Sequence, residues 1–158
     1  MLAEEKKIIP LLNSANYGAG TSMDSFKMLG GKGTIILTFG AVTGNAVMKI
    51  YSGASAAAKT SAIPFKIAVA GGAIGAASGD YLAAWTDVVA ASGATLTGAT
   101  YTTKMAVVEF DASSMDTAND EEWITVELDG SASSGILHAV AVIDNPRYAS
   151  SRNTTLLA

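Results

Sequence analysis

The segment of the chain that comes closest to a known chemical motif is residues 53–60, GASAAAKT. It differs by one position from the phosphate-binding loop G-x-x-x-x-G-K-[ST], because Ala58 stands where the second glycine belongs. In that motif a helix follows the loop and directs its backbone amides at phosphate. Here Pro64 and the alternating residues after it predict a strand. We therefore interpret the segment as a small-residue loop between strands and expect no nucleotide site.

His138 and an acidic run at residues 116–122 are the other candidates for chemistry. Catalysis by histidine needs a positioned nucleophile and a group that orients the ring, whereas this single histidine lies inside an apolar run. The acidic run lacks the ligand spacing and central glycine of an EF-hand loop, so we predict a solvated turn. With one histidine and no cysteine, multi-histidine and cysteine-ligated metal sites are excluded. We expect no catalytic residue, metal or cofactor.

Composition limits the classes of partner. A chain of 158 residues is long enough to bury roughly two thirds of its unfolded surface in one domain. The net charge is -4, and the stretch from Glu109 to Asp129 carries acidic residues without a basic one, which disfavours nucleic acid. The uncharged segment 67–79 is shorter than the ~20 residues that span a bilayer, so no membrane partner is expected. The first residues lack the basic start and apolar core of a signal peptide, which predicts synthesis in the cytoplasm.

Short apolar runs separated by acidic and Ser/Gly-rich turns predict an all-β fold. Residues 105–110, 123–128 and 136–143 are expected to form an antiparallel meander, with the last strand covered on both faces because it is apolar on both. Residues 34–39 and 46–51 flank GAVTGN and are expected to form a hairpin. Residues 64–70 alternate as a half-buried strand does.

The ends of the chain are expected to lie outside the strands. Pro10 suits only an edge or strand-end position, and we interpret residues 1–12 as an arm. Residues 13–32 predict a long surface loop with a short strand near 25–28, and residues 80–96 predict either a helical turn or a strand. We therefore expect an antiparallel, jelly-roll-like β-sandwich over 33–149, an arm and loop over 1–32, and a C-terminal tail over 150–158.

Trp123 is the residue best suited to contact a partner. Alternation places Ile124, Val126 and Leu128 inward, so Trp123 falls on the outward face of its predicted strand. An outward aromatic gives a large contact area at low entropic cost and is a candidate anchor. The alternative is that Trp123 packs beneath the arm or long loop of its own chain.

Several segments together resemble the capsid decoration, cement or minor capsid proteins of tailed bacteriophages. The resemblance covers most of the chain and is carried by six segments in order, which are LNSA at 12–15, TIILTFGAVTGNAVMKIYSGASA at 34–56, IPFKIAV at 63–69, KMAVVEFDASSMD at 104–116, WITVEL at 123–128 and HAVAVIDNPRYAS at 138–150. One departure is Phe65-Lys66-Ile67, which lacks the aromatic residue and arginine expected in that strand.

The resemblance implies a non-enzymatic β-sandwich subunit on the outer surface of an icosahedral virion, where it would bridge capsomers of the major capsid protein. It also implies a homo-oligomer, either a dimer or a trimer. The alternatives are a tail or neck structural protein and a head-fibre carbohydrate-binding domain. Arg147 and Tyr148 belong to what looks like the final turn of the family. The predicted interface residues are Ile8, Ile9, Leu11, Trp123, Arg147, Tyr148, Leu156 and Leu157.

Overall fold

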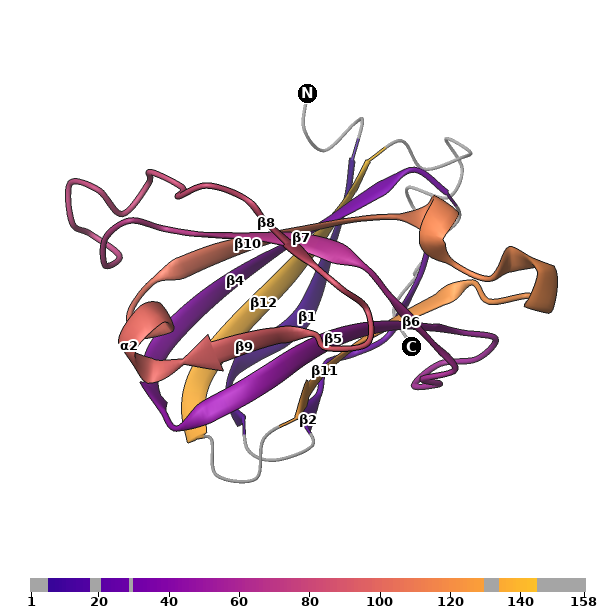
Figure 1. Cartoon of the computed structure of the whole chain (residues 1–158), viewed down its shortest axis with the longest axis horizontal. Coiled ribbons are helices and arrows are strands. Elements are labelled where there is room, and N and C mark those ends of the chain that lie inside the picture. The colour runs from indigo at the N-terminus through magenta and orange to yellow at the C-terminus, as the bar shows by residue number, and fades with distance from the viewer. Residues whose placement is uncertain (1–5, 18–20, 29, 130–133, 145–158) are drawn as a thin grey trace.

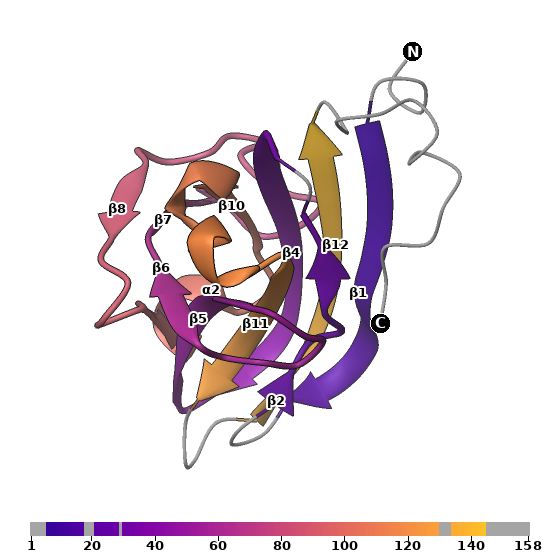
Figure 2. The ribbon, with the colours of Figure 1, turned by 90° about the vertical axis from the view of Figure 1, so that its right-hand side faces the viewer.

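A computed structural model describes residues 6–17, 21–28, 30–129 and 134–144, which form two antiparallel sheets packed face to face (Figures 1 and 2). Sheet A contains, in spatial order, β1 (Lys6–Tyr17), β12 (Ser134–Asp144), β4 (Lys32–Thr43), β10 (Met105–Asp111), β7 (Phe65–Val69) and β8 (Thr86–Val88). Sheet B contains β2 (Thr21–Ser22), β3 (Phe26–Lys27), β11 (Trp123–Asp129), β5 (Asn45–Gly53), β6 (Ser61–Ile63) and β9 (Ala94–Thr97). The short helices are α2 (Gly98–Tyr101), η1 (Ala112–Ser114) and η2 (Thr117–Asn119). The predicted all-β sandwich is confirmed.

The core lies between the sheets and follows the predicted alternation. In β4 the inward side chains are Ile35, Leu37 and Phe39, and all are buried. In β11 they are Ile124, Val126 and Leu128. Full burial of each such side chain contributes about 1.5–3 kcal/mol to stability, so these strands hold the two sheets together.

The strand order is that of a jelly roll. The strands β1, β12, β4 and β10 lie side by side in sheet A, and β11 lies between the β2/β3 segments and β5 in sheet B. Along the chain, β10, β11 and β12 alternate between the sheets, so the predicted meander is wrong although all three strands are present. The reason is that η1 and η2 carry the chain from one sheet to the other between β10 and β11.

The predicted hairpin at residues 34–51 is also wrong. β4 pairs with β10 and β12, whereas β5 pairs with β6, β9 and β11. Only Gly44 separates β4 from β5, and its positive φ of 77° allows the chain to turn sharply from sheet A into sheet B. Period-two alternation gives the buried face of each strand but does not give the sheet to which it belongs.

The N-terminal segment is part of the sandwich. Instead of an arm, Lys6–Tyr17 forms edge strand β1 and pairs with β12. Ile9 and Leu11 are buried in the core, which removes them from the predicted interface. The free side of β1 is also occupied at one point, because the backbone N–H of Asp24 donates to the Leu11 carbonyl at 3.1 Å.

Two other regions differ from expectation. Residues 21–28 were predicted to be mainly surface loop, yet Met23, Phe26 and Met28 are buried because they close the core beside β1 and β11. In residues 80–96 the strand alternative is confirmed by β8 and the start of β9. The predicted C-terminal tail, with Leu156 and Leu157, and the predicted turn residues Arg147 and Tyr148 lie outside the described residues.

Candidate interaction surfaces

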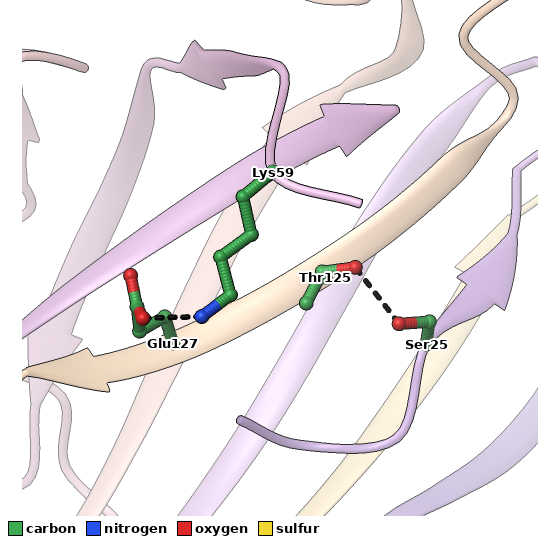
Figure 3. Close-up of polar contacts among 4 residues, drawn as sticks. All are labelled: Ser25, Lys59, Thr125 and Glu127. Carbon is green, nitrogen blue, oxygen red and sulfur yellow. Dashed lines mark hydrogen bonds and ion pairs between the residues drawn. The ribbon is translucent and has the colours of Figure 1, made fainter. Parts of the chain in front are cut away.

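The outer side of sheet B is polar, and the segment around Ser25 and the loop between β5 and β6 partly cover it (Figure 3). The Ser25 hydroxyl and the Thr125 hydroxyl share a buried hydrogen bond of 2.8 Å, and the N–H of Ala57 donates to Ser25 Oγ at 2.9 Å. Lys59, from the loop between β5 and β6, pairs with Glu127 on β11. The phosphate-loop-like segment 53–60 is therefore an inter-strand loop fastened across β11, as the sequence predicts.

Trp123 lies on this closed side of the molecule. It is half-buried, and the Lys27 ammonium nitrogen lies 5.3 Å from the centroid of its ring. Lys27 also pairs with Glu122 at 3.1 Å. A cation over an aromatic face covers that face, so Trp123 packs partly within its own chain and is a poorer anchor than its outward position predicts.

The acidic run is not wholly solvated, which corrects the predicted turn. Glu121 is only 2% exposed and accepts hydrogen bonds from the Ser52 hydroxyl at 2.5 Å and the Ser61 hydroxyl at 3.0 Å. These bonds connect the segment before β11 to β5 and β6, which gives the carboxylate a structural role. Within the described residues, no cluster of three or more histidine, aspartate or glutamate side chains is arranged to hold a metal ion.

Tyr51, on β5, also lies on the outer side of sheet B, opposite Thr125 of β11. The Glu127 carboxylate accepts a hydrogen bond from the Tyr51 hydroxyl. Burial raises the pKa of Tyr51, and the negative charge of Glu127 raises it further. Tyr51 therefore stays neutral over the physiological range. It is another polar group on this face that is used within the chain.

Replacing Ser25 by alanine is expected to lower the free energy of unfolding by about 1–3 kcal/mol, because the Thr125 hydroxyl and the Ala57 N–H both lose a buried partner. Lys59→Ala should cost at most about 1 kcal/mol, since its pair with Glu127 is partly exposed. Urea unfolding of both variants measures the difference. Equal losses of unfolding free energy in the two variants would show that the buried hydrogen bond between Ser25 and Thr125 does not stabilise the outer side of sheet B.

The outer side of sheet A carries an apolar stretch that is partly exposed, which distinguishes it from the polar outer side of sheet B. Residues that pair directly across strands point to the same face, and the pairing aligns one outward row across five strands. From β1 to β7, the row is Pro10, Val140, Ile36, Val107 and Ala68, of which Ala68 is buried and the other four are at least partly exposed. We call this set the apolar row.

Other apolar side chains extend the apolar row on the same face. Ile8, which pairs with Val142, is 47% exposed, and Ile136 is 52% exposed. The expectation that residues 136–143 are covered on both faces is therefore wrong, because Leu137 and its inward neighbours are buried while the opposite face is partly open. His138 lies on this open face opposite Thr38.

The link between β7 and β8 is a second exposed apolar surface, which we call the β7–β8 loop (residues 70–85). It projects from the sandwich at the left of Figure 1. Its large side chains are exposed, with Ile74 at 55%, Tyr81 at 68% and Trp85 at 42%. Backbone hydrogen bonds fix its shape, since Gly71 N–H donates to the Tyr81 carbonyl and Ile74 N–H donates to the Thr103 carbonyl, both at 2.8 Å. Aromatic side chains on a braced projection are suited to contact a partner.

Tyr81 and Trp85 were not among the residues selected from the sequence. Their signal was the presence of two aromatic residues within five positions of a Gly/Ala-rich link, where neighbouring side chains are too small to cover them. Of the residues selected, Ile8 lies on the open face, Trp123 lies on the closed one, and Ile9 and Leu11 lie in the core.

Comparisons with known proteins do not identify a family. No protein-family model matches the chain, and no curated protein matches it. A solved structure of the infectious bursal disease virus Gx strain aligns at 9% identity with a TM-score of 0.18, and this chain spans 42% of the length of that one. A similarity of this size carries no argument. No helix among the described residues has the length and hydropathy to cross a membrane.

Proposed function

We propose that this chain is a structural virion protein that binds the outer surface of an icosahedral phage capsid and bridges neighbouring capsomers of the major capsid protein. The observation that carries the proposal is the β7–β8 loop. Three of the six large hydrophobic side chains that are most exposed within the described residues lie on this single projection. Such a loop acts through contact area and needs no chemistry of its own.

The sequence resemblance to capsid decoration proteins supports the same assignment and names the partner class. The jelly-roll subunit has a partly open apolar face and a projecting apolar loop, and the loop adjoins that face at Thr38 and Met105. Together they offer an extended surface for contacts. On a symmetric shell, many copies repeat the same contacts, so a modest affinity per site is multiplied when one molecule touches more than one neighbour.

The proposal is tested by mixing the purified protein with expanded phage heads that lack it and sedimenting the heads. We expect saturable binding, with a fixed number of copies per head set by the symmetry of the shell. Unexpanded proheads and ribosomes of similar mass serve as controls. Absence of binding to expanded heads, or binding that rises without saturation on all three particles, would contradict the proposal.

A further inference from the structure

We infer that two copies of this chain pair face to face through the outer side of sheet A. The apolar row runs without a charged residue from Pro10 on β1 to Ala68 on β7, with Ile36 at its centre. Sheets that bury such faces pack about 10 Å apart, and another sheet is the surface that best matches this row, in which Val140, Ile36 and Val107 are β-branched. Sheet B of the same chain already covers the inner side, so the second sheet comes from another molecule, which we assign as a second copy of this chain.

The size of the face matches that of a stable dimer. Each residue of a sheet covers about 16 Å², from a strand spacing of ~4.8 Å and a rise of ~3.3 Å. The strands of sheet A contain roughly 50 residues, so the face presents about 800 Å². Specific protein interfaces bury about 800 Å² on each partner. A second copy that covers the whole face would therefore form an interface of standard size.

The charges of the face lie at one end and are largely paired. Lys6 contacts Asp144 at 2.6 Å, and Lys66 contacts Asp87 at 3.4 Å. Glu109 lies beside Lys66 in the register of the sheet. These residues lie on the side of the apolar row that leads towards the start of β4, whereas Thr38 and His138 occupy its other side.

This charge distribution selects a symmetry. Consider a two-fold axis that lies between the two packed sheets, perpendicular to the strands and close to Ile36. This axis reverses the strand direction, so it places the charged ends of the two copies at opposite ends of the interface. The apolar rows then meet in the middle, where an interface is most desolvated, and the ion pairs stay at its solvated ends. A pairing with the strands in the same direction would stack the two charged ends on each other and remove their ion pairs from water, which is unfavourable.

The first test is Ile36→Glu, with Val47→Glu as the matched control. Val47 is, like Ile36, a half-buried β-branched residue on the outer side of a strand, but it lies on sheet B. Sedimentation equilibrium of the wild-type protein should give a dimer. The Ile36→Glu variant should dimerise at least about 100-fold more weakly, because each copy brings an unpaired carboxylate to the axis. The Val47→Glu variant should dimerise as the wild type does.

The second test is chemical cross-linking, which can be used if the Ile36→Glu variant does not fold. The chain has no cysteine, so Ile36→Cys introduces a unique thiol close to its copy at the axis. Oxidation, or a short bis-maleimide, should convert most of this variant to a covalent dimer, whereas Val47→Cys should stay largely monomeric on a denaturing gel.

These experiments use purified protein without a shell, so their outcome is independent of the proposed capsid function. A wild-type protein that stays monomeric up to roughly 100 μM would overturn the pairing, since an interface of this size should associate well below that concentration. Equal cross-linking at positions 36 and 47, or an unchanged dimer in a folded Ile36→Glu variant, would overturn it as well.

Discussion

Expanded heads should bind the Tyr81→Ala/Trp85→Ala double variant at least about 100-fold more weakly than the wild-type protein. Each side chain is a large exposed aromatic group on the β7–β8 loop, and truncation of one such anchor at the centre of an interface costs about 2 kcal/mol or more. The fold should be unaffected, because neither side chain is buried in the core.

The measurement is a binding isotherm of labelled protein on expanded heads, with thermal unfolding as the check on folding. Trp123→Ala is the control for the Trp85 part of the double variant, since it removes the same side chain from the closed face of sheet B. It should bind as the wild type does. If Trp123→Ala weakens binding and the double variant does not, the shell-facing surface is sheet B, and the role given to the β7–β8 loop is wrong.

Phe26→Ala should lower the free energy of unfolding by about 3–5 kcal/mol, the usual range for removal of a fully buried phenylalanine. The ring of Phe26, on β3 of sheet B, has no exposed surface. Its centroid lies 6.4 Å from that of Phe110, on β10 of sheet A, so the pair joins the two sheets. Domains of this size are stable by about 5–15 kcal/mol, so a loss of this size removes much of the margin.

Guanidinium unfolding of Phe26→Ala measures this effect, and Lys27→Ala is the neighbouring control. The Lys27 side chain is partly exposed and forms a surface ion pair with Glu122, which is worth at most about 1 kcal/mol. A loss below about 1 kcal/mol for Phe26→Ala would mean that residues 21–28 do not close the core.

The sequence predicts the strands and their buried faces well, because alternation is a local property. The inward residues of β4 and β11 follow directly from period two, and the structure buries all of them. The lack of a helix after residues 53–60 likewise follows from Pro64, and the structure has a strand there.

The sheet to which each strand belongs could not be predicted from alternation. A strand with one buried face has the same sequence pattern in either sheet of a sandwich. The pattern of β4 and β5 therefore predicts a hairpin, although Gly44 takes the chain from one sheet to the other between them. Residues 21–28 were missed for a related reason, since Met23, Phe26 and Met28 are spaced irregularly and are separated by polar residues.

The candidate surfaces were predicted only in part. The preference for Trp123 rested on its outward position, but the sequence does not show that Lys27 lies over its ring from a strand almost 100 residues away. The apolar row depends on pairing between five strands that are distant in the chain. Both features come from register, which is set by the whole fold.

The most direct test of the proposed function is electron microscopy of intact virions that carry this protein, at a resolution that distinguishes strands. We predict jelly-roll density on the outside of the shell between capsomers, with the β7–β8 loop against the major capsid protein. Density for this chain in the neck, the tail or a fibre, with none on the shell, would contradict the assignment.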